Sequence, residues 1–192
     1  MNAPNKSVAD NPVPPVDQAS ATPVTKPKPK ELRDKTVAAL RIALDPKSAD
    51  AGVIAALRRC DPESPPPAFY RVATGILDKY DDNLGTNRDD RDTRWTIVAS
   101  AFARAQGFLD GFVPFGQALA QANVAEMRFL RLMEASTFQL PHVVRSVVHQ
   151  LTQKGQPFDP RELADLVLTA DTEEGRMVRR RIARSYYRHA DK

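Results

Sequence analysis

Apolar residues recur at helical spacing along nearly the whole chain after Glu31, and strand-like alternation of apolar and polar residues is absent. Val37, Leu40 and Leu44 form the first stripe, and Pro46 ends that helix. The same pattern predicts further helices over residues 49–60, 67–80, 93–106, 115–122, 124–135, 139–154, 160–170 and 172–189. We therefore predict an all-α fold of eight or nine helices.

Apolar stripes and helix-ending residues support individual helices. The helix over 67–80 is expected to bury Phe69, Val72, Ile76 and Tyr80, and the helix over 93–106 is expected to bury Trp95, Val98, Phe102 and Ala105. Gly155 and Pro157 end one helix, and Asp159 before Pro160 starts the next. The intervening segments 61–67, 81–91 and 107–114 are expected to be a proline-rich break, a polar loop and a turn.

Proline content separates the first 30 residues from the rest. They hold seven of the sixteen prolines and few large apolar side chains, so residues 1–30 are predicted to be a disordered Pro/Lys tail. The remainder is predicted to form two helical lobes, an N-terminal lobe over 31–122 and a C-terminal bundle over 123–192. The tail is either a plain solvated segment or a loose electrostatic tether to nucleic acid.

Charge is spread unevenly along this chain of 192 residues, whose formal net charge is +4. Residues 31–122 are about neutral, whereas residues 123–192 carry twelve Lys or Arg against nine Asp or Glu. A weakly basic protein binds nucleic acid if its charge lies on one face. The single cysteine, Cys60, excludes an internal disulfide. With no signal peptide and no membrane-length apolar segment, we expect a cytoplasmic protein.

The last predicted helix has the densest basic pattern. Arg176, Arg180, Arg184 and Arg188 are four residues apart and form one stripe, opposite an apolar stripe of Val178, Ile182 and Tyr186. At least one of Tyr186 and Tyr187 is expected in the core. Guanidinium groups are permanently charged and pair bidentately with phosphate. The stripe is therefore either a solvated face, partly neutralised by Glu173 and Glu174, or part of a nucleic-acid surface.

Other arginines lie where they could join such a surface, and phosphate binding needs several of them together. The predicted nucleic-acid-binding residues are Arg58, Arg59, Arg128, Arg131, Arg145, Arg180 and Arg184.

Catalytic and metal-binding motifs are absent. The acidic loop containing Asp81, Asn83 and Gly85 lacks EF-hand spacing. His142, His149 and His189 do not form HExxH, and no CxxC, P-loop, GxGxxG or GxSxG occurs. We predict a protein that is not an enzyme and holds no cofactor or metal.

Short motifs in order along the chain resemble the CasB family, the small subunits of the type I-E CRISPR effector complex Cascade. They are AALRR at 55–59, PAFYR at 67–71, FGQALA at 115–120, AEMRF at 125–129, and the segments 158–168 and 179–187. The resemblance covers about residues 32–188. Pro160 and Ile182 replace tryptophans typical of the family, and Gln117 replaces an arginine, which weakens a phosphate contact there.

This resemblance implies an all-helical, non-catalytic subunit in antiviral defence that binds nucleic-acid backbone without sequence readout and stabilises the R-loop. The implied partners are the guide RNA–target DNA hybrid, the displaced DNA strand, other Cascade subunits and a second copy of the chain. Two alternatives remain at this stage: a dimeric helix-turn-helix regulator, whose recognition helix would begin among Asp171, Glu173 and Glu174, and a scaffold whose arginines pair with acidic protein partners.

Overall fold

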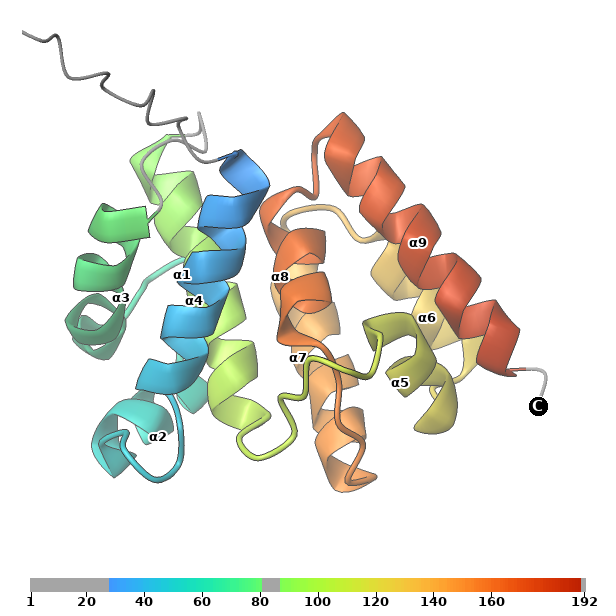
Figure 1. The fold of residues 1–192 in the computed structure, drawn as a ribbon, viewed down its shortest axis with the longest axis horizontal. Helices are drawn as coiled ribbons and strands as arrows, with labels where there is room; N and C mark the ends of the chain where they lie inside the picture. The colour runs from blue at the N-terminus through green and yellow to red at the C-terminus, as the bar shows by residue number, and fades with distance from the viewer. Residues whose placement is uncertain (1–27, 81–86, 191–192) are drawn as a thin grey trace, which may run out of the picture.

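The computed structural model describes residues 28–80 and 87–190, and within these ranges it contains nine α-helices and no β-strand (Figure 1). The all-α prediction is confirmed. The helices are α1 (Pro29–Ala43), α2 (Ala51–Arg59), α3 (Pro67–Tyr80), α4 (Arg88–Arg104), α5 (Phe115–Gln121), α6 (Glu126–Glu134), α7 (Leu140–Gln153), α8 (Pro160–Leu168) and α9 (Glu173–Ala190). The described helices include none long and apolar enough to cross a bilayer.

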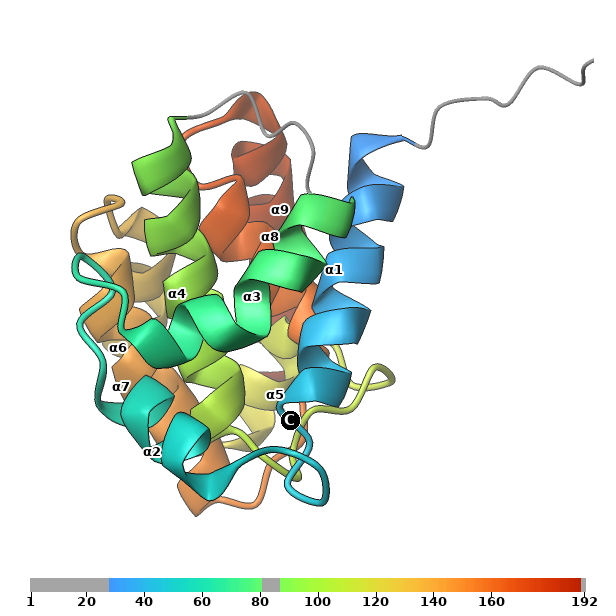
Figure 2. The same cartoon turned by 90° about the vertical axis from the view of Figure 1, so that its left-hand side faces the viewer.

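Helix α4 forms the centre of the molecule and packs against α2, α7 and α8 (Figure 2). Every residue from Arg94 to Ala103 is buried, as expected for a helix surrounded by others. Trp95, Val98, Phe102 and Ala105 are all fully buried, so the predicted inward stripe is confirmed. The predicted start of this helix was wrong by several residues, because the helix begins at Arg88. The negative charges of Asp89 and Asp90 in its first turn interact favourably with the positive N-terminal end of the helix dipole.

Helix α3 buries a different face from the one expected. Phe69 is buried as predicted, but Ala73 and Leu77 follow it, while Val72 and Ile76 are only partly buried. The buried residues are thus four apart, and the small side chain of Ala73 lies on the face that packs against α1 and α2. Because helical spacings of three and four are both compatible with one face, the sequence could not separate these two stripes.

Helices α5 and α9 pack closely, and Gly116 allows it. A Cβ atom at Gly116 would overlap the backbone oxygen of Ile182 on α9. The predicted apolar stripe of α9, Val178, Ile182 and Tyr186, is buried. Tyr186 stacks on Phe129 of α6 with 3.9 Å between ring centroids. Helix α9 is therefore attached to the core along its length through one face, and the opposite face is left to solvent.

The helix ends mostly follow the expected signals. The Asp159 carboxylate accepts the Arg161 backbone N–H at 2.9 Å, and Gly155 ends α7 with a φ of 63°. Helix α1 begins at Pro29, so the predicted tail was two residues too long, because proline is well suited to the first turn of a helix. The rest of that tail, and the residues 81–86 of the acidic loop, lie outside the described residues. The division into lobes at residue 122 stays a prediction.

Candidate nucleic-acid interface

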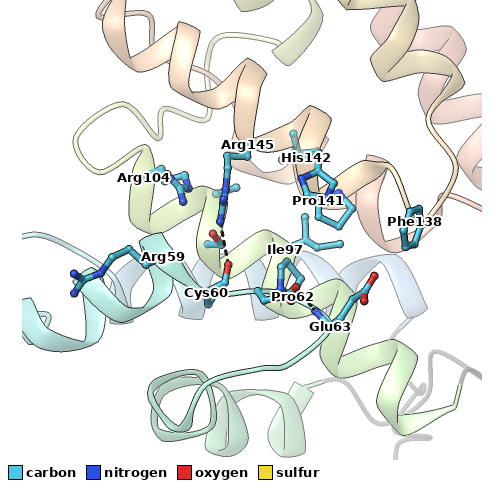
Figure 3. A pocket seen from close by; sticks show the side chains of 14 residues that line it. Arg59, Cys60, Pro62, Glu63, Ile97, Arg104, Phe138, Pro141, His142 and Arg145 are labelled. Atoms are coloured by element: carbon cyan, nitrogen blue, oxygen red, sulfur yellow. Dashed lines mark hydrogen bonds between the residues drawn. The ribbon is translucent and has the colours of Figure 1, made fainter.

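A surface pocket of about 290 Å³ lies between α2, α4 and α7 (Figure 3). Three arginines from three different helices line it: Arg59 at the end of α2, Arg104 at the end of α4 and Arg145 in the middle of α7. Asp61 and Glu63, from the segment that joins α2 to α3, and Phe138, from the segment before α7, also contribute to the lining. Residues separated by up to 86 positions in the sequence thus meet at one site.

Backbone oxygens of neighbouring helices hold two of the predicted arginines in place, Arg145 and Arg58. The Arg145 guanidinium donates a 3.0 Å hydrogen bond to the carbonyl oxygen of Cys60 at the end of α2. Arg58 Nε donates a 2.7 Å bond to the carbonyl oxygen of Ala103, and a second Arg58 nitrogen donates to Gln106 at 3.0 Å. The last carbonyls of a helix are favourable partners for a cation. Both side chains therefore have fixed positions while their remaining donors stay available.

Arg104 was not predicted from the sequence, yet it lies among the other arginines. Its Nε is buried without a hydrogen-bond partner in the described structure. Burial lowers the pKa of Arg104, the nearby charge of Arg145 lowers it further, Cys60 opposes this shift, and Arg58 adds a smaller lowering. The only sequence signal for it was its position in the last turn of a helix, where basic residues are common.

Arg58, Arg59, Arg104 and Arg145 form no ion pair with a carboxylate within the described ranges, although Asp61 and Glu63 line the same pocket. The ion pairs there involve other basic residues, and none includes Arg58, Arg59, Arg104 or Arg145. We call these four side chains the arginine cluster. Mutual repulsion among its members is offset when an anion binds, so the cluster is suited to phosphate.

The other predicted arginines lie on different helices. Arg128 of α6 is exposed and donates to the side chain of Gln150 on α7. Gln150 is five positions after Arg145, roughly 140° around the helix. Arg128 therefore contacts a different side of α7 from the side that carries Arg145. Arg131 of α6 is also exposed. The structure therefore places Arg59 and Arg145 with Arg104 in one pocket and Arg58 near Arg104, but it does not bring Arg128 and Arg131 to them.

The arginines of α9 divide into bonded and unbonded side chains. Arg176 pairs with Glu173, Arg179 donates to the backbone oxygen of Ala135 at 3.0 Å, and Arg181 pairs with Glu162 at 3.1 Å. Arg180 and Arg184 are exposed on the side of α9 opposite its buried stripe, without an ion pair in the described structure. They form a second basic surface, separate from the arginine cluster.

Acidic residues of the α8–α9 turn bind other helices. The Asp171 carboxylate accepts hydrogen bonds from Thr137 and Arg94, each at 2.6 Å. These bonds, that from Thr137 first, lower the pKa of Asp171 against the opposing effect of burial. Glu174 pairs with Arg33 of α1. These carboxylates thus fix the turn at the start of α9. A helix-turn-helix recognition helix would approach phosphates with this end, where the carboxylates would repel them.

Groups that could support metal or thiol chemistry are isolated from one another. The described residues include no group of three or more His, Cys, Asp or Glu side chains placed to hold a metal ion. The thiol of Cys60 is buried and lies 3.1 Å from the backbone oxygen of Leu57. Burial raises the pKa of Cys60, so it remains a thiol near neutral pH.

Fold and site together define a class: over the described residues, a helical protein with a cluster of arginines that form no ion pairs at the junction of three helices. The family model described as CRISPR-associated protein Cse2 matches residues 53–187. The chain belongs to this family, and the CasB resemblance found in its motifs is confirmed. A search of curated proteins found no match.

Solved structures with the same fold carry related descriptions. CasB from Thermus thermophilus is 26% identical with a TM-score of 0.60, and the match covers 81% of this chain and 97% of that one. M. ruber CasB is 22% identical with a TM-score of 0.61, covering 83% and 94%. A chain in the structure of E. coli Cascade bound to a PAM-containing dsDNA target is 20% identical with a TM-score of 0.60, covering 80% and 95%.

Proposed function

We propose that this protein is the non-catalytic small subunit of a type I-E Cascade complex and binds nucleic-acid backbone without reading sequence. The proposed partners are the guide RNA–target hybrid, the displaced DNA strand, other Cascade subunits and a second copy of the chain. Membership of the Cse2 family supports this assignment. So does the fold shared with a chain of E. coli Cascade, a complex described as bound to a dsDNA target.

One observation carries the nucleic-acid part of the proposal: the arginine cluster has no carboxylate partner in the described structure. Elsewhere on the same molecule arginines are paired, as Arg33, Arg94 and Arg181 are. The cluster therefore keeps positive charge that ion pairs do not cancel, at a pocket where three helices meet. Contacts between guanidiniums and phosphate oxygens carry no direct sequence information, so binding through them is expected to be independent of sequence.

Modest phosphate binding is sufficient for the proposed role. An RNA–DNA hybrid is about as stable as the DNA duplex that it replaces, so R-loop formation is nearly balanced. A few backbone contacts therefore shift the equilibrium toward the open state. We propose that the arginine cluster supplies such contacts, and that Arg128, Arg131, Arg180 and Arg184 contact nucleic acid elsewhere on the surface.

Binding of labelled single-stranded DNA to the full chain, alone and in the reconstituted Cascade complex, tests the proposal. Two oligonucleotides of equal length and scrambled sequence should bind equally, and affinity should fall steeply between roughly 50 and 200 mM salt. Replacing Arg145 with glutamate should weaken the binding of both oligonucleotides equally. As a matched control, Arg41→Glu changes an exposed arginine of α1, which packs against α3 and α8 rather than at the cluster. Absence of binding in both settings, or preference for one sequence, would overturn the proposal.

A further inference from the structure

We propose that the pocket between α2, α4 and α7 is a subsite for one nucleotide of a single strand, with the base stacked on Phe138 and its phosphate at the arginine cluster. The inference rests on the proposed function and adds to it that the protein holds a base as well as backbone. It also names the ligand chemistry: an unpaired nucleotide rather than a duplex, whose bases are already stacked and cannot enter a side pocket.

Phe138 is the first element of the subsite. Its side chain is 73% exposed, although large apolar side chains are normally buried. It lies in a short turn before α7, where the Gln139 N–H bonds the backbone oxygen of Ser136 at 2.9 Å. Its ring is thereby presented at the pocket beside Pro141 and His142. An exposed aromatic ring next to a basic groove is the arrangement that single-strand binding proteins use for base stacking.

The opposite end of the pocket is built for an anion. Figure 3 shows Arg59, Arg104 and Arg145 on one side and Phe138 with Glu63 on the other. The Glu63 carboxylate repels a phosphate from the Phe138 end, while the guanidiniums attract it to theirs. Charge thus sets the direction in which a nucleotide lies. Arg104 lines that end of the pocket and forms no ion pair in the described structure, so its positive charge is available to an anion there.

The volume of the pocket is consistent with one nucleotide. Small-molecule sites in proteins usually measure about 300 to 1,000 Å³, and the present pocket, at about 290 Å³, lies just below that range. Its lining combines apolar groups, among them Ile97 and Val144, with polar groups, of which the arginines lie at one end. That combination fits a flat base joined to a charged phosphate.

The test compares a single-stranded DNA oligonucleotide with an abasic oligonucleotide of the same length, so that phosphate and base contributions separate. The full chain should bind the base-containing strand more tightly. Phe138→Ala should lower that affinity about 5- to 100-fold, the size expected for one stacked base, without changing affinity for the abasic strand. The control Phe112→Ala removes a ring that is 92% exposed and lies outside this pocket. This variant should leave the affinity for both strands unchanged.

A strand containing 2-aminopurine gives an independent signal, because stacking on Phe138 should quench its fluorescence and Phe138→Ala should restore it. Equal affinity for the two strands, or equal effects of Phe138→Ala on both, would overturn the nucleotide subsite while leaving backbone binding intact. Failure of the unchanged protein to bind either strand would instead overturn the proposed function. Since Phe138 is exposed, its variant should fold, which the thermal unfolding midpoint checks.

Discussion

The Arg145 guanidinium on α7 bonds the carbonyl oxygen of Cys60 at the end of α2, across 85 positions of sequence. This bond links the two helices that form opposite sides of the pocket, and it fixes the guanidinium before any ligand arrives. Arg58 is fixed similarly by the carbonyl oxygen of Ala103. Side chains held in this way lose little conformational entropy on binding an anion, which improves their contribution to affinity.

Arg104 should be more important for binding than for stability. Its Nε is buried without a partner in the described structure, and Arg145 and Arg58 repel its charge. Arg104→Met should therefore leave the free energy of unfolding within about 0.5 kcal/mol of the unchanged protein, while weakening DNA binding. Arg58→Met, which breaks two hydrogen bonds, should cost about 1 kcal/mol. Urea unfolding measures the free energy of unfolding of both variants. A larger decrease for Arg104→Met than for Arg58→Met would contradict this account.

Asp165 should be one of the most sensitive positions for stability. It bonds Arg33 at 2.7 Å, and both side chains are only 3% exposed. Asp165→Ala removes the buried carboxylate that pairs with Arg33 and leaves that guanidinium only the half-exposed Glu174, which should cost about 3 to 5 kcal/mol. Glu173→Ala is the control, since Glu173 and its partner Arg176 are largely exposed and that pair should be worth at most about 1 kcal/mol. Both free energies of unfolding are measured by urea titration, and equal losses for Asp165→Ala and Glu173→Ala would contradict the larger contribution of the buried pair.

Glycine at 116 should be required for the packing of α5 on α9. A Cβ there would overlap the backbone of α9, so Gly116→Ala should destabilise the protein by about 1 to 3 kcal/mol. At Gly75 on α3, by contrast, an added Cβ meets nothing within 4 Å. Gly75→Ala should therefore stabilise the protein by up to about 1 kcal/mol through its higher helix propensity. Thermal unfolding midpoints should move in opposite directions, and an unchanged or raised midpoint for Gly116→Ala would refute the packing argument.

The Asp171 contacts should make stability depend on pH in the acidic range. The Thr137 and Arg94 bonds lower its pKa in the folded state, so their contribution is fully present above the unfolded pKa of about 4 and is lost as pH falls through the lower folded value. Asp171→Asn should cost about 0.5 to 1 kcal/mol near pH 7, a modest amount because the side chain is 56% exposed. The difference from the unchanged protein should shrink below pH 4, and a constant difference would contradict this explanation.

Helical periodicity predicted the fold well because most helices here bury one clear face. Errors arose where local signals compete: Val72 and Ala73 both fit a helical stripe on α3, and Asp89 and Asp90 suit a loop as well as a helix start. The site was harder to predict. Arg58 and Arg145 were identified by residue type, but their approach to Arg104 depends on the packing of α2, α4 and α7, which no local pattern contains.

The most direct test of the account is the salt dependence of single-stranded DNA binding by the double variant Arg104→Gln and Arg145→Gln. Each phosphate contact contributes about 0.7 to the slope of log affinity against log salt concentration for a single strand. The double variant should bind more weakly with a slope shallower by about 1.4, whereas Arg41→Gln should keep the original slope. An unchanged slope in the double variant would show that the arginine cluster does not contact phosphate.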